Sequence, residues 1–125
     1  MADNQSWPAR VLILDDEPMI AMDLEYLLLD AGYAIACVTG KIDAALLVIN
    51  SGGCDAAILD ANLSGVSAAP AAAALTALGI PFLVLSGYSA DQLPENMRSA
   101  PCVQKPAHPT ELIDLLSGIV KARHA

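Results

Sequence analysis

Acidic residues, a serine and a lysine follow apolar runs of the sequence at four separate places. Asp15 and Asp16 come directly after one such run, and Asp60 closes another. Ser86 and Lys105 each follow a later run. Three carboxylates in one crevice would repel one another, and a hard divalent cation with oxygen ligands removes that cost. These residue types therefore indicate a Mg²⁺ site that also receives an anionic group.

The remaining side chains of this set suit a phosphoryl group. The ammonium of Lys105 is a compact positive charge that can contact one phosphate oxygen. The hydroxyl of Ser86 can donate a hydrogen bond to another oxygen, and Gly87 leaves room for the group to approach. Phosphoryl transfer needs mainly positioning and stabilisation of charge. The sequence therefore contains the parts that this chemistry requires.

The elements that must position these residues alternate along the chain. Strands are predicted over 10–14, 33–38, 55–60, 81–85 and 102–104, and helices from Pro18 to the stop at Ala31-Gly32 and over 42–50, 67–78, 89–98 and 109–122. This alternation with short connections predicts an α/β fold, a parallel sheet with helices on both faces. Ligands bind such open sheets at the carboxyl ends of the strands, where the polar residues above are placed.

Composition sets the size and class of the protein. The 125 residues are 55% hydrophobic and 4% aromatic, which suits one domain with a core of Leu, Ile, Val and Ala and excludes disorder. We expect a loose N-terminal leader over residues 1–8 and one folded domain over residues 9–123. No apolar run reaches the length of a membrane span, and the N-terminus lacks a signal peptide's apolar region. We therefore expect a cytoplasmic protein without a membrane partner.

The charge and the cysteine content indicate which partners and metals the protein is not expected to bind. The net charge is −8, and the whole excess lies in residues 1–60. An acidic chain lacks the basic footprint that nucleic acid requires, so no nucleic-acid partner is expected. Cys37, Cys54 and Cys102 are widely spaced and form no zinc pattern, so we expect reduced, small core residues.

The ordered set of motifs resembles the receiver domain of the response regulator (CheY-like) family over roughly residues 9–122. The matching elements are the pair Asp15-Asp16, the strand-ending Asp60, the hydroxyl of Ser86 and the pair Lys105-Pro106. The resemblance implies a flavodoxin-like sheet with the strand order 2-1-3-4-5 and Mg²⁺ as cofactor. It also implies that the Lys105-Pro106 peptide bond is cis.

The resemblance further implies a role for each acidic residue. Asp60 would be the phosphoacceptor. Asp16 would bind Mg²⁺ directly, and Asp15 largely through water. The backbone carbonyl of Asn62 would be a further metal ligand.

The same resemblance assigns the phosphoryl contacts and the switch. Ser86 and Lys105 would hold the phosphoryl group, and Ser86, Gly87, Tyr88 and Cys102 are the switch candidates. Cys102 stands where the family usually has an aromatic residue, so the common aromatic coupling cannot operate as such. The stretches PFLVLSGY (81–88) and DANLSG (60–65) resemble a narrower class, the FATGUY class of single-domain receivers.

These resemblances predict a single-domain response regulator of a two-component system or phosphorelay. A histidine kinase or a histidine phosphotransfer protein would donate the phosphoryl group, and the output would be contact with an unknown downstream protein or a phosphate sink. The chain would catalyse only its own phosphorylation and dephosphorylation. Two alternatives stay open, a receiver fragment of a larger regulator or hybrid histidine kinase, and a phosphorylation-independent docking domain. An aspartyl phosphatase is disfavoured because ILDDEP does not match D-x-D-x-[TV].

Structural explanations of the same residues also stay open. Asp15 and Asp16 could be N-caps of the first helix, Ser86 could be a turn residue, and Tyr88 could serve packing. The alanine-rich helix over 67–78 lacks charge and could form a partner or self-association surface, or it could simply be a tolerated alanine-rich helix. We expect a monomer or weak dimer.

Overall fold

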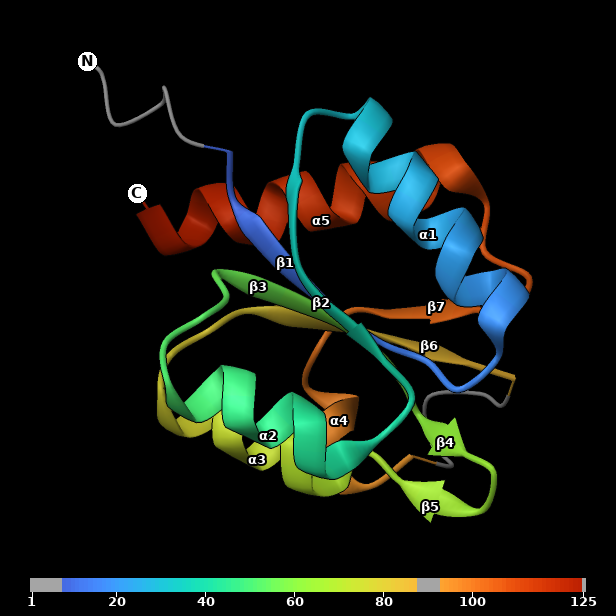
Figure 1. The fold of residues 1–125 in the computed structure, drawn as a ribbon, viewed down its shortest axis with the longest axis vertical. Helices are drawn as coiled ribbons and strands as arrows, with labels where there is room; N and C mark the ends of the chain where they lie inside the picture. Colours follow the sequence, from blue (N-terminus) through green and yellow to red (C-terminus); the bar gives the residue numbers. More distant parts are fainter. Residues whose placement is uncertain (1–7, 88–92, 125) are drawn as a thin grey trace.

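The five apolar runs form one parallel sheet in the computed structural model, which describes residues 8–87 and 93–124 (Figure 1). The strands are β1 (Arg10–Leu14), β2 (Ala34–Thr39), β3 (Ala56–Asp60), β6 (Phe82–Ser86) and β7 (Cys102–Gln104). Their order across the sheet is β2-β1-β3-β6-β7, which is the predicted order 2-1-3-4-5 of the five parallel strands. The predicted fold class is thus confirmed. The leader proposed over residues 1–8 lies, apart from its last residue, outside the described residues.

The central strands are apolar along their whole length because both of their faces are covered. All five residues of β3 and all five of β6 are buried. In β1 only Arg10, the first residue, is exposed. The edge strand β2 is mostly half-buried instead. A sheet with helices on both faces explains why these runs lack the polar alternation of a half-exposed strand.

Helices form a layer on each side of the sheet (Figure 1). One layer consists of α1 (Pro18–Asp30) and α5 (Pro109–His124), whose Leu24, Leu28, Leu112 and Leu116 pack on one face of the sheet. The other layer consists of α2 (Ile42–Asn50), α3 (Ala69–Ala77) and α4 (Glu95–Arg98), with Ile49, Ala72, Leu75 and Met97 in a second core cluster. Within the described residues, no helix combines the length and apolar character needed to cross a bilayer.

A short hairpin separates β3 from α3, and the sequence did not predict it. It consists of β4 (Asn62–Leu63) and β5 (Val66–Ser67), which pair antiparallel. Ser64 and Gly65 form its two-residue loop, with φ angles of 53° and 89°. Positive φ at both loop positions is typical of the tightest hairpin turns. Because residue 67 belongs to this hairpin, α3 begins at Ala69 and not at residue 67 as predicted.

The helix predicted over 89–98 is also shorter in the described residues. It begins after Pro94, which is the N-cap of α4. A proline has no N–H to donate and suits a helix start better than its interior. Residues 89–92 of that prediction lie outside the described residues. The predictions over 10–14, 42–50 and 102–104 match the observed elements, and the other boundaries differ by at most two residues.

Candidate functional site

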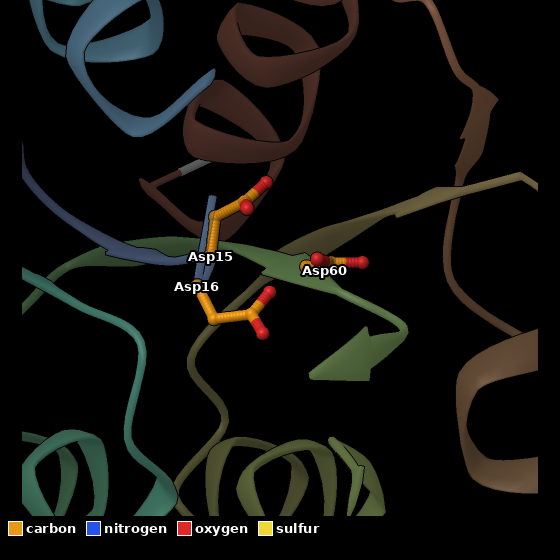
Figure 2. A group of neighbouring side chains, drawn as sticks. All are labelled: Asp15, Asp16 and Asp60. Atoms are coloured by element: carbon orange, nitrogen blue, oxygen red, sulfur yellow. The ribbon is translucent and has the colours of Figure 1, made fainter. Parts of the chain in front are cut away.

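The carboxyl ends of β1 and β3 bring three carboxylates together. These two strands pair directly, so Asp15 and Asp16 after β1 lie beside Asp60 at the end of β3. One carboxylate oxygen of each aspartate lies within 4.8 Å of the others. Figure 2 shows all three side chains extending toward the same side of the strand ends. This cluster, Asp15, Asp16 and Asp60, could hold a metal ion and is called the acidic cluster below.

Lys105 supplies the opposite charge at the same place. Its Nζ lies 3.2 Å from Oδ2 of Asp60 and 3.5 Å from Oδ2 of Asp15. The carboxylate of Glu17 lies 3.3 Å away on the solvent side. Burial lowers the pKa of Lys105, but attraction to Asp15 and Asp60 outweighs it and leaves this pKa above its usual value. The lysine is therefore charged and close enough to contact a group bound to Asp60.

Asp15 is the most enclosed charge of the cluster. Its side chain is 1% exposed. Burial, together with repulsion from Asp60, raises the pKa of Asp15, although a hydrogen bond from the backbone N–H of Glu17 opposes this effect. That N–H lies 2.9 Å from Oδ1 of Asp15. Oδ2 accepts no hydrogen bond from the described residues. A buried carboxylate oxygen that accepts no hydrogen bond and has only the Lys105 ammonium, 3.5 Å away, beside it fits a site that receives a cation.

The N-cap explanation of the acidic pair is wrong for α1. The N-cap residue is Glu17, and no side chain caps the helix. Asp15 instead accepts the N–H of Glu17 in the loop before the helix. As the sequence indicated, Pro18 occupies the first turn. The placement of Asp15 and Asp16 is therefore not explained by helix capping.

Ser86 and Lys105 are joined through the backbone. Ser86 is the last residue of β6 and is 1% exposed, so it is not an ordinary surface turn residue. Its carbonyl oxygen accepts the N–H of Lys105 at 2.8 Å. A Cβ added at Gly87 would meet no atom within 4 Å, so the space expected beside Ser86 is present. The Lys105-Pro106 peptide bond is cis, as the family resemblance implied.

Asn62 contacts the site through its backbone. Its N–H donates a hydrogen bond to Oδ1 of Asp60 at 3.2 Å. Its side-chain Oδ1 accepts the N–H of Gly65 at 2.7 Å, which ties the hairpin loop together. The backbone of Asn62 therefore lies next to Asp60, while the role of its carbonyl as a metal ligand stays a prediction.

Two further residues touch Asp16, and the sequence did not single them out. A Cβ added at Gly40 would lie 2.7 Å from the Cα of Asp16, so only glycine fits there. The hydroxyl of Ser64 donates a hydrogen bond to Oδ2 of Asp16. The pair Ser64-Gly65 is a turn signal that could have revealed the hairpin, but no sequence signal points across 48 residues to Asp16.

The structure places only part of the predicted switch. Cys102 is half-buried at the beginning of β7 and packs against the cluster that contains α3 and α4. Burial raises the pKa of its thiol. Tyr88 lies outside the described residues. As expected, Cys37, Cys54 and Cys102 are all free thiols, and Cys54 is buried in the core.

Comparisons with known proteins identify the family. The family model described as the response regulator receiver domain matches residues 11–117. The chain therefore belongs to the receiver domain family of response regulators. No curated protein matches the chain.

Solved structures agree with this assignment. The structure of SdrG from Sphingomonas melonis Fr1 is 36% identical with a TM-score of 0.78, covering 90% of this chain and 97% of that one. A BeF₃-activated conformation of SdrG from Pseudomonas melonis Fr1 is also 36% identical, with a TM-score of 0.76, covering 92% and 98%. The PhyR receiver domain of Erythrobacter litoralis is 25% identical with a TM-score of 0.80, covering 94% and 93%.

Proposed function

We propose that this receiver accepts a phosphoryl group on Asp60 from a phosphohistidine donor. An oxygen of the Asp60 carboxylate would attack phosphorus, the bond from phosphorus to the donor imidazole would break, and an acyl phosphate would form. The observation that carries this proposal is the placement of Asp60, whose Oδ1 accepts the N–H of Asn62 while its Oδ2 lies 3.2 Å from Lys105. Both contacts orient the carboxylate. The ammonium of Lys105 can also contact the oxygens of the incoming phosphoryl group as a point charge.

Mg²⁺ fits the donor set of the acidic cluster. The oxygens are hard ligands, and three carboxylates that face the single ammonium of Lys105 leave negative charge that a cation would balance. Asp15, Asp16 and Asp60 would hold the ion, with the carbonyl of Asn62 as the further predicted ligand. When bound, the ion would offset the charge of the carboxylates and of the incoming phosphoryl group.

The surface next to the site supports a protein as donor. Met19, Met22, Tyr26 and Leu29 are exposed on α1 at alternating spacings of three and four residues, which places them along one side of the helix. Met22 also lines a hollow of about 540 Å³ that reaches Asp15 and Asp16. An exposed apolar strip beside a hollow that reaches two residues of the acidic cluster suits contact with another protein.

We further propose that the protein acts in the cytoplasm as a single-domain regulator of the FATGUY class, within a two-component system or phosphorelay. The single-domain part of this proposal is supported by the similarity to SdrG, because the match covers 97% of that chain. Its catalysis would be limited to its own phosphorylation and dephosphorylation. Signalling would proceed by protein contacts, as a monomer or weak dimer, or the protein would act as a phosphate sink. A receiver within a larger regulator or hybrid kinase is the alternative.

The donor is tested by comparing two sources of phosphoryl groups in the presence of Mg²⁺. We expect a phosphorylated histidine phosphotransfer protein and acetyl phosphate both to label the wild type, and neither to label Asp60→Asn. A Tyr26→Glu variant should lose labelling by the protein donor and keep labelling by acetyl phosphate, because only the former needs α1. Failure of both donors on the wild type would instead favour a phosphorylation-independent docking domain.

A further inference from the structure

The turn of the β4–β5 hairpin contains a residue that its backbone conformation does not favour. Ser64 has a φ of 53°, a region in which glycine and asparagine are the usual residues. The next position, Gly65, satisfies the same requirement without strain. An uncommon residue in a left-handed conformation asks for a compensating interaction.

That interaction is the hydrogen bond from the Ser64 hydroxyl to Oδ2 of Asp16. It joins the hairpin loop to a member of the acidic cluster that is 48 residues away in sequence. The hairpin is also joined to Asp60, because the N–H of Asn62 donates to Oδ1 of that residue. The β4–β5 hairpin therefore holds two of the three carboxylates from one side.

The backbone of Gly40 also lies close against Asp16. A Cβ at residue 40 would lie 2.9 Å from the Cβ of Asp16, so a side chain larger than that of glycine at this position would press on the stem of Asp16. The hydrogen bond from the Ser64 hydroxyl restricts rotation of the Asp16 carboxylate. A carboxylate has two oxygens, so the bond to Oδ2 leaves Oδ1 available to a cation.

We infer that Ser64 is a positioning residue for the metal ion, which acts by holding the Asp16 carboxylate through its hydroxyl. The inference rests on the proposed function only in that the acidic cluster binds Mg²⁺. Hydrogen bonds to carboxylates that ligate a metal orient them before the ion arrives, and losing one typically weakens metal affinity roughly tenfold or more. Ser64 thereby links the conformation of the hairpin to occupancy of the site.

The test is titration of the whole protein with Mg²⁺ alone, followed by calorimetry, for the wild type, Ser64→Ala and Ser64→Gly. Both variants lose the hydroxyl, but glycine suits the positive φ and alanine does not. We expect the Kd for Mg²⁺ to rise roughly tenfold in both. The matched control is Ser67→Ala, whose hydroxyl lies in the same hairpin and accepts the N–H of Ala69 instead, and its Kd should equal that of the wild type.

A second measurement separates the loss of the Ser64 hydroxyl from strain in the turn. The free energy of unfolding without Mg²⁺ should distinguish Ser64→Ala from Ser64→Gly, because only alanine strains the turn, while their Kd values should agree. Unchanged or tighter Mg²⁺ binding in both variants would overturn the inference and leave the proposed function standing. A wild type that binds no Mg²⁺ would overturn both.

Discussion

Asp15 is the residue whose burial disfavours the charge that the proposed metal site requires. It lies buried near Asp60 and Lys105, and burial raises its pKa. The carboxylate therefore ionises more readily in the unfolded chain than in the folded one. It follows that the free energy of unfolding falls, through this residue, as the pH rises past the unfolded value of about 3.9.

Replacing Asp15 by asparagine should therefore stabilise the protein without a metal. At pH 7 in the presence of a chelator, we expect Asp15→Asn to raise the free energy of unfolding by on the order of 1 kcal/mol. The amide keeps the oxygen that accepts the N–H of Glu17 and removes a buried charge. Chemical denaturation measures this, and a less stable variant would show that the ion pair with Lys105 outweighs burial.

Mg²⁺ should reverse the ranking of these two proteins. A ligand that binds only the folded state raises stability by mass action. The wild type should gain stability as Mg²⁺ is added, and Asp15→Asn should gain less because it lacks one carboxylate. Equal gains in the two proteins would exclude Asp15 from the metal site.

At this scale, the meeting of the residues at the strand ends was predictable, and the contacts that neighbouring loops make with them were not. Asp15, Asp60 and Lys105 could be predicted to meet because parallel strands end at one edge of a sheet. Gly40 and Ser64 could not, because their importance depends on how closely two loops approach Asp16. Such distances arise from packing, which leaves no periodic signal in the sequence.

At the scale of the element, α1 shows how one helix serves both the core and the surface. Leu28 is fully buried against the sheet, whereas its neighbour Leu29 is 51% exposed. The helix thus buries one side and presents Met22, Tyr26 and Leu29 on the other. An apolar residue on α1 is therefore not by itself a core residue.

The two neighbouring leucines provide a matched pair. Leu28→Ala should lower the free energy of unfolding by roughly 2–5 kcal/mol, since it leaves a cavity in the cluster under α1 and α5. Leu29→Ala should change it by less than about 0.5 kcal/mol, as is usual at exposed positions. Thermal or urea denaturation gives both values. Similar losses in the two variants would contradict this assignment of helix faces.

Elements with an apolar run or with proline and glycine signals were predictable, and the two-residue strands were not. The five strands of the main sheet and the helices α1, α2 and α5 follow from apolar runs and from proline and glycine signals. The strands β4 and β5 have two residues each, which is too few for a period to appear. Their pairing instead depends on the turn at Ser64-Gly65 and on burial of Leu63.

At the scale of the whole molecule, the two ends of the sheet differ in how far their acidic residues are paired with basic ones. The carboxyl end gathers three acids against Lys105. At the amino end, both carboxylate oxygens of Asp55 accept hydrogen bonds from the side chain of Arg10. Nε lies 3.1 Å from Oδ2, and a terminal nitrogen lies 3.1 Å from Oδ1. Arg123 of α5 also donates to the carbonyl of Asp55 at 2.9 Å. The charges at the amino end are thus balanced within the fold, whereas the carboxyl end keeps an excess of negative charge.

This pairing predicts a pH dependence of stability. The hydrogen bond from Arg10 lowers the pKa of Asp55, so its contribution is present above the unfolded value of about 3.9 and is lost as the pH falls through the lower folded value. Because Arg10 is half-exposed, solvent limits this contribution to about 1 kcal/mol. Asp55→Asn should be less stable than the wild type at pH 7, and the difference should shrink below about pH 4. A difference that is constant with pH would contradict the role of this ion pair.

The central claim, that Asp60 accepts a phosphoryl group, is tested most directly by the intact mass of the protein. The wild type and Asp60→Asn are incubated with acetyl phosphate, and separately with a phosphorylated histidine protein, each with Mg²⁺ and with a chelator. We predict the mass increase of one phosphoryl group in the wild type, dependent on Mg²⁺ and absent in Asp60→Asn. An increase that persists in Asp60→Asn, or no increase with either donor, would contradict the account.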